Sequence, residues 1–207
     1  MKKLGRYANL MRLSIGASLL IGLGDYVLLK IGEPVGPFLF SFGLLGVCVL
    51  ELNLFTGKCG FWFEDRISVL ELVLILAINL VAGYGFGVIF GMMDGTVVNA
   101  AVGKVATWDC NLAFFLKSVM CGAIMYLAVE LYRRGTKLGI LFGVPLFIFC
   151  GFQHSIANAI TMGVAGTFSL SVLLCALGNL VGALGAWALC CGIKLSQIRN
   201  RTRRIKS

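Results

Sequence analysis

Asn79-Leu80-Val81-Ala82-Gly83 and Asn179-Leu180-Val181-Gly182-Ala183 are near-copies of one five-residue phrase, 100 residues apart. Each copy lies in an apolar segment long enough to cross a bilayer. At the same offset, Leu54-Phe55-Thr56 corresponds to the neighbourhood of His154-Ser155-Ile156, which holds the only histidine of the chain. A repeat of this size in a membrane protein indicates two similar helical bundles that face each other, with a pathway where they meet.

The composition is that of an integral membrane protein. Of the 207 residues, 59% are hydrophobic and only 13% are charged, and the mean hydropathy is +0.94. A chain of this length and apolarity has the bilayer as its solvent. Six apolar stretches are long enough to span it, at residues 13–31, 35–55, 67–93, 111–132, 138–160 and 168–193.

The net charge of +9 is concentrated at the two ends of the chain. Residues 1–12 carry four basic side chains and residues 194–207 carry six, with no acidic residue in either segment. Beside a transmembrane helix, basic segments of this kind mark the cytoplasmic side, so we predict no nucleic-acid partner. Both termini are therefore expected inside the cell, which requires an even number of spans. The sequence predicts a multi-pass protein of the inner (plasma) membrane.

The spans divide into two groups of three, which make one channel domain over residues 1–207. We expect inverted repeats at 13–93 and 111–193, between the basic cytoplasmic tails 1–12 and 194–207. An odd number of spans per repeat makes the second copy enter the membrane from the opposite side. Residues 94–110 would join the two copies on the outer face.

Two of the spans are not continuous apolar helices. The second span runs into the polar stretch Glu51 to Lys58, and the fifth contains Gly151 to Asn158. Non-helical backbone at membrane depth survives only where protein buries it or where it lines a water-filled cavity. Interrupted helices at matching positions of two halves indicate a transport site. The predicted fold is all-α, with six transmembrane helices of which the second and fifth are interrupted.

Four motifs, in order along the chain, resemble the formate/nitrite transporter family, which includes hydrosulfide channels. They are Leu54-Phe55-Thr56-Gly57, Ala113 to Val129, Gly151 to Asn158, and Gly178-Asn179-Leu180-Val181-Gly182. The resemblance implies an aquaporin-like protomer that assembles as a homopentamer. It also implies that small monovalent anions pass through each protomer and not along the central axis.

The resemblance further implies a set of pore residues in this chain. Four polar side chains would lie along the pathway: His154 as the central histidine, Thr56 opposite it, and the amides of Asn158 and Asn179. Four apolar side chains would constrict it in two pairs, Phe55 with Leu44 and Phe40 with Phe147. Lys104, after the third span, would draw anions into the outer vestibule.

The chain departs from the family pattern at several of these motifs. Gln153 stands before the histidine, and Asn53 stands two residues before Phe55, where the family usually has acidic residues. Gly122 follows Cys121 where the family has asparagine, and Glu130 replaces a tryptophan. These differences concern the substrate and any pH gating more than the fold.

Solvation suggests a mechanism for such a pore. An anion in a slit lined by Phe40 and Phe147 loses hydration that the rings cannot replace, whereas a neutral weak acid loses far less. We therefore expect Lys104 to concentrate the anion and the substrate to gain a proton near His154, whose imidazole has an ordinary pKa of about 6.5. Formate or nitrite is the expected substrate, with hydrosulfide, acetate or lactate as alternatives. Passive and proton-coupled transport both remain open.

Other classes of protein fit the sequence less well. His154 could be a neutral imidazole packed between helices, and Lys104 an ordinary loop lysine. An intramembrane serine hydrolase would need His154 and Ser155 to face each other, which adjacent residues on a helix do not. Metal or cofactor chemistry is not expected, because the chain has one histidine and no clustered cysteines. A passive scaffold needs no interrupted spans, and the Asn-Pro-Ala loops of aquaporins are absent from the sequence.

Overall fold

The computed structural model describes residues 2–190, with side chains from residue 5 onward, so the predicted basic tail 194–207 lies outside it. Every regular element in this range is helical. The elements are α1 (Lys2–Ile31), α2 (Val35–Val49), α3 (Phe55–Lys58), the 3₁₀ turn η1 (Cys59–Phe61), α4 (Val69–Met93), α5 (Gly95–Val105), α6 (Leu112–Arg133), α7 (Leu138–Phe149), α8 (Ser155–Ala165) and α9 (Ser171–Cys190).

Within residues 2–190, four helices are long and apolar enough to cross a membrane: α1, α4, α6 and α9. They correspond to the first, third, fourth and sixth predicted spans. The helix that contains the first predicted span begins at residue 2, so it also takes in most of the predicted basic tail 1–12. The connection 94–110 also contains a helix that we did not predict, α5, whose N-terminus is capped by the side chain of Asp94.

The predicted interruptions of the second and fifth spans are confirmed. α2 and α7 are only 15 and 12 residues long. The second residue after each helix has left-handed backbone, Glu51 after α2 (φ +53°) and Gly151 after α7 (φ +64°), and a short extended stretch follows. The chain then resumes as the short helices α3 and α8.

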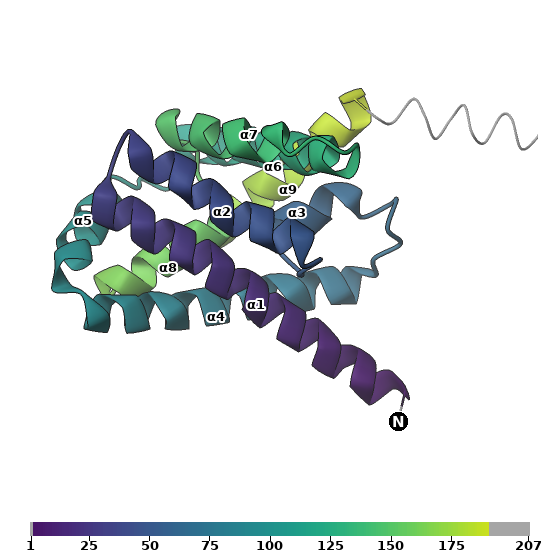
Figure 1. Cartoon of the computed structure of the whole chain (residues 1–207), viewed down its shortest axis with the longest axis horizontal. Coiled ribbons are helices and arrows are strands. Elements are labelled where there is room, and N and C mark those ends of the chain that lie inside the picture. The colour runs from purple at the N-terminus through teal and green to yellow at the C-terminus, as the bar shows by residue number, and fades with distance from the viewer. Residues whose placement is uncertain (1, 191–207) are drawn as a thin grey trace, which may run out of the picture.

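Each short helix packs against the opposite half of the chain. α8 lies along α4 and also contacts α1, whereas α3 and η1 contact α6 and α9. Figure 1 shows α6, α7 and α9 grouped together, with α8 crossing to the side of α1 and α4. Glycines permit these close approaches: a Cβ at Gly87 would collide with the carbonyl oxygen of Ile160, and a Cβ at Gly122 with that of Asn179.

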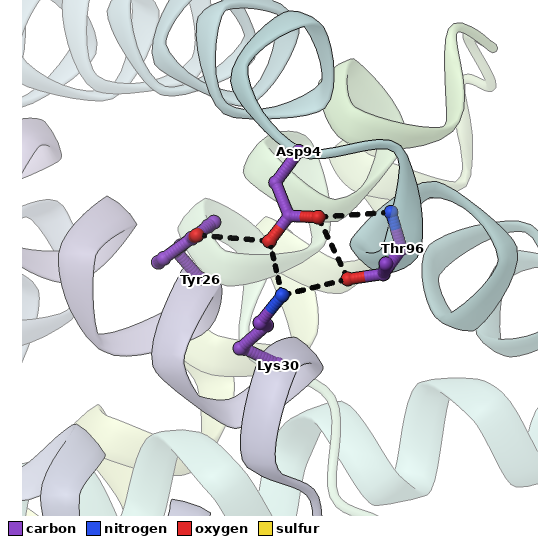
Figure 2. A network of polar contacts seen from close by, with 4 residues as sticks. All are labelled: Tyr26, Lys30, Asp94 and Thr96. Carbon is purple, nitrogen blue, oxygen red and sulfur yellow. Dashed lines mark hydrogen bonds and ion pairs between the residues drawn. The ribbon is translucent and has the colours of Figure 1, made fainter.

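A polar network ties the beginning of α5 to α1 (Figure 2). The ammonium of Lys30 lies 2.6 Å from Oδ2 of Asp94, and the hydroxyl of Tyr26 donates to the same oxygen at 3.1 Å. The other carboxylate oxygen accepts from the backbone N–H and the hydroxyl of Thr96, at 3.0 and 2.7 Å. This network fixes where α5, and therefore Lys104 in its last turn, lies relative to α1.

Candidate transport site

Asn79 of α4 holds the first break in place. Its Oδ1 accepts the backbone N–H of Phe55 at 2.8 Å, where α3 begins. Its Nδ2 donates to the carbonyl oxygens of Ser14 on α1, at 2.8 Å, and of Asn53 in the break, at 3.1 Å. Asn79 is fully buried, so one amide satisfies backbone groups that the interruption would otherwise leave unpaired.

Asn179 of α9 holds the second break in place in the same way. Its Oδ1 accepts the backbone N–H of Ser155 at 2.9 Å, where α8 begins. Its Nδ2 donates at 2.8 Å to the carbonyl oxygens of Ser118 on α6 and of Gln153 in the break. The two asparagines of the repeated phrase therefore make equivalent bonds, as expected for two copies of one unit. Asn179 is fully buried and lines neither of the cavities described below.

His154 and Thr56, from the two breaks, meet between the two halves of the chain. Nε2 of His154 lies 2.8 Å from Oγ1 of Thr56. Nδ1 accepts the backbone N–H of Ala157 at 3.1 Å, so the imidazole caps the N-terminus of α8. A nitrogen that accepts a backbone N–H carries no hydrogen, which places the hydrogen of the neutral ring on Nε2. The ring therefore donates to Thr56, and the hydroxyl hydrogen of Thr56 is left for another acceptor.

This arrangement is unsuited to nucleophilic catalysis. A general base needs a free lone pair facing the nucleophile, whereas Nε2 of His154 presents its hydrogen to Thr56. Ser155, the other candidate nucleophile, has a buried hydroxyl with no hydrogen bond to any residue in 2–190. The pair instead forms a chain of two hydrogen-bond donors. The imidazole donates to the hydroxyl of Thr56, and that hydroxyl can donate to an acceptor that approaches it.

A cavity of about 340 Å³ approaches this pair from the α5 end of the molecule. We call it the α5-side cavity. His154, Phe40 and Phe147 line it near the centre, and Lys104 and Lys117 add two cations. The predicted pore residue Asn158 also lines it, with Nδ2 donating to Oε1 of Gln153 at 2.9 Å.

A second cavity, of about 290 Å³, approaches from the α3 end. We call it the α3-side cavity. Leu44 lines it near the centre, and four charged side chains surround the rest: Glu51, Lys58, Asp65 and Arg133. Arg133 pairs with Asp65 at 2.8 Å. The α5-side and α3-side cavities thus reach the same central layer from opposite directions.

The apolar side chains predicted to constrict the pore lie in this central layer. The rings of Phe40 and Phe147 meet edge to face, with centroids 6.0 Å apart, and Phe147 stacks on His154 at 5.8 Å. Phe40, Phe147, Leu44 and Phe55 are all at most 3% exposed. The phenylalanine pair borders the α5-side cavity and Leu44 borders the α3-side cavity.

The sequence analysis did not single out Asp25 of α1, which lines the α5-side cavity. Its side chain is fully buried, Oδ1 lies 3.5 Å from Nζ of Lys104, and Oδ2 accepts the hydroxyl of Thr161 at 2.8 Å. The sequence does contain a signal for Asp25, because an acidic residue in the middle of an apolar span needs a partner and marks a candidate functional site.

The helical arrangement is shared with solved structures of membrane channels. The fold is that of the formate/nitrite channels: a solved structure described as an FNT family ion channel matches with a TM-score of 0.71 and 21% identity, covering 88% of each chain. A pentameric formate channel with formate bound matches with a TM-score of 0.68 and 19% identity, over 96% of this chain and 99% of that one.

Sequence comparison adds one relative from the transporters. The uncharacterized transporter YrhG of Bacillus subtilis (strain 168) is 27% identical over 182 residues, which cover 74% of this chain and 68% of the relative. No family model matches the sequence.

Proposed function

We propose that this protein is a channel of the formate/nitrite transporter family that carries a small monovalent anion, formate or nitrite, across the plasma membrane. The observation that carries the proposal is the Thr56–His154 pair, with Nε2 and Oγ1 2.8 Å apart in the layer where two cavities approach each other. The likeness in fold to a formate channel and the relative among the transporters support it.

In this proposal the α5-side cavity faces the outside and both termini face the cytoplasm. An arriving anion meets the ammonium groups of Lys104 and Lys117, which line that cavity. The anion then has to pass the rings of Phe40 and Phe147, which cannot replace the water it loses. Protonation removes this obstacle: a formate ion takes a proton from hydronium in the cavity, leaving formic acid and water.

The central pair guides the substrate through the narrow layer. Nε2–H of His154 donates to Thr56, and the hydroxyl of Thr56 then donates to the substrate oxygen at the moment when water is absent. The imidazole acts here as a donor that polarises the hydroxyl and stays neutral itself. The substrate crosses as the neutral acid and releases its proton in the α3-side cavity, so that one proton moves with each anion.

The assembly proposed for this chain is a homopentamer in the lipid bilayer, by likeness to the pentameric formate channel. Large apolar side chains that face outward include Phe42 at 67% exposed and Val81 at 76% exposed. In a membrane such surfaces meet lipid or neighbouring protomers.

Flux through proteoliposomes tests the proposal. Vesicles loaded with formate, nitrite, hydrosulfide, acetate or lactate would be compared at pH 5.5 and pH 7.5, with the wild type and with His154→Asn and His154→Phe. Asparagine keeps an N-cap for α8 whereas phenylalanine does not, so the first variant removes the imidazole with the helix start preserved. We expect the wild type to carry formate faster at the lower pH. The formate flux of His154→Asn should be at least about tenfold lower, which corresponds to one lost interaction of about 1.4 kcal/mol. Wild-type vesicles that release none of these anions would refute the channel.

A further inference from the structure

Asp25 is a buried carboxylate inside a membrane-spanning helix. Its side chain has no exposed surface, and it lies where α1, α5 and α8 meet. Oδ2 accepts from the hydroxyl of Thr161 on α8 at 2.8 Å. Oδ1 faces Nζ of Lys104 on α5 at 3.5 Å and has no hydrogen bond to any residue in 2–190. A buried charge is tolerated when it is paired, so the carboxylate and the ammonium depend on each other.

Both ends of α5 are tied to α1, and the two ion pairs have opposite polarity. At the beginning of α5, Lys30 of α1 pairs with Asp94 (Figure 2). At its last turn, Asp25 of α1 pairs with Lys104. The first pair fixes the backbone of α5, and the second fixes the one lysine side chain of that helix that lines the α5-side cavity.

A lysine on a surface helix extends its ammonium into water unless something holds it. Lys104 does not do this, because only 36% of its side chain is exposed while its ammonium faces Asp25. The other charged groups along the same cavity are Asp109 and Lys117. Neither makes an ion pair with Lys104 in the described part of the chain, and the residue before His154 is the neutral Gln153.

We propose that Asp25 is the positioning residue of the anion-binding site: it holds the Lys104 ammonium over the α5-side cavity so that an arriving anion meets a fixed donor. This inference rests on the proposed function, since it names the residue that orients the anion-attracting cation. Thr161 in turn orients the carboxylate. Removing the carboxylate frees the ammonium to move into water, which weakens capture of the anion and leaves the central layer unaltered.

Transport kinetics test the consequence for substrate. Asp25→Asn keeps the shape of the side chain and removes its charge, and we expect the KM for formate to rise about fivefold, the range of one partly exposed ion pair, with maximal flux within about twofold. Lys104→Gln should raise the KM for formate by a similar factor. The KM of the double variant, Asp25→Asn with Lys104→Gln, should be no higher than that of either single variant. A lower KM for Asp25→Asn, or effects that multiply in the double variant, would overturn the proposal.

Two measurements test the pair without transport. Acylation of the purified protein by a water-soluble amine reagent, read by mass spectrometry, should rise severalfold at Lys104 in Asp25→Asn and stay constant at Lys117. Lys104→Gln should lower the melting temperature, because it leaves Asp25 buried without its cation, and adding Asp25→Asn should restore part of the loss. Unchanged acylation at Lys104, or no restoration, would contradict the pairing.

The transport, acylation and melting experiments distinguish failure of the proposed channel function from failure of the role proposed for Asp25. If the wild type carries no anion, the proposed function fails while the acylation and melting experiments still decide the role of Asp25. If Asp25→Asn does not fold, Thr161→Val removes only the donor to Oδ2. We then expect a smaller rise in KM and in Lys104 acylation, and no change in either would count against the proposal.

Discussion

The hydroxyl oxygen of Thr56 lies 2.8 Å from Nε2 of His154, although the two residues are 98 positions apart in the sequence. Each comes from the break that follows a shortened helix, and each stands at the beginning of the short helix that resumes the chain. In the proposed mechanism Thr56 donates to the substrate and His154 donates to Thr56.

Replacing Thr56 tests this division of roles. Thr56→Val keeps the branched shape and removes the hydroxyl, so we expect formate flux to fall at least about tenfold, the equivalent of one lost hydrogen bond of about 1.4 kcal/mol to the substrate. Thr56→Ser keeps the hydroxyl and should retain most of the flux. Equal flux in the valine and serine variants would show that the hydroxyl has no part in transport.

The two asparagines that hold the breaks should be equally important for stability. Asn79→Leu and Asn179→Leu each leave buried backbone groups of a break without partners, at about 1–3 kcal/mol for each unpaired group. We expect a large fall in melting temperature in detergent for both variants. Asn99→Leu, on the exposed face of α5, is the control and should melt like the wild type. A stable Asn179→Leu variant would contradict the role given to its amide.

The second residues after α2 and α7 can be compared directly. Both have left-handed backbone, but one is Glu51 (φ +53°) and the other is Gly151 (φ +64°). A side chain in this region costs about 1 kcal/mol. Glu51→Gly should therefore raise the free energy of unfolding by about that amount, and Gly151→Ala should lower it by a similar amount. Changes of the same sign in both variants would show that backbone conformation is not the deciding factor.

The network of Figure 2 predicts a pH dependence of stability. The Lys30 ammonium, together with the hydroxyl and the N–H of Thr96, holds the pKa of Asp94 well below its usual value. A carboxylate with a lowered pKa in the folded state stabilises the protein above the unfolded-state pKa of about 3.9, and this contribution is lost as the pH falls towards the folded-state pKa.

Asp94→Asn is the variant that tests this dependence. Asparagine still caps α5, so the variant should melt at a lower temperature than the wild type at pH 7, and the difference should narrow below pH 4. Melting curves from pH 3 to pH 8 measure it. A difference that stays constant with pH would exclude an ionic contribution from Asp94.

The sequence was most informative where polar residues interrupt apolar spans. Glu51 to Lys58 and Gly151 to Asn158 predicted two breaks, and the structure has both, because unpaired backbone at membrane depth leaves a visible polar signature. The repeated phrase at Asn79 and Asn179 also predicted two equivalent halves. The sequence could not show what these asparagines bind, since their partners lie 24 to 65 positions away.

Features that depend on contacts between distant elements were missed. Asp25 is a single acidic residue on an apolar helix, and only the folded chain brings it to Lys104 of α5 and Thr161 of α8. Residues 94–110 were expected only to join the two halves, because α5 (Gly95–Val105) has 11 residues, too few to span a bilayer. Asn179 was assigned to the pathway by family resemblance. Its described bonds join Ser155 and Gln153 at the second break to Ser118 of α6 and Cys175 of α9.

The crossing of α3 and α8 into opposite halves has a consequence for biogenesis. Residues up to Met93 leave the ribosome before α6 and α9 exist. Asn79 of α4 can already hold the first break, but the surface of α3 and η1 that packs on α6 and α9 stays uncovered until the last helix is made. The translocon or a chaperone must shelter this uncovered surface of α3 and η1 during that interval, and a ribosome stalled after α4 would present a half-finished protein that quality-control proteases can recognise.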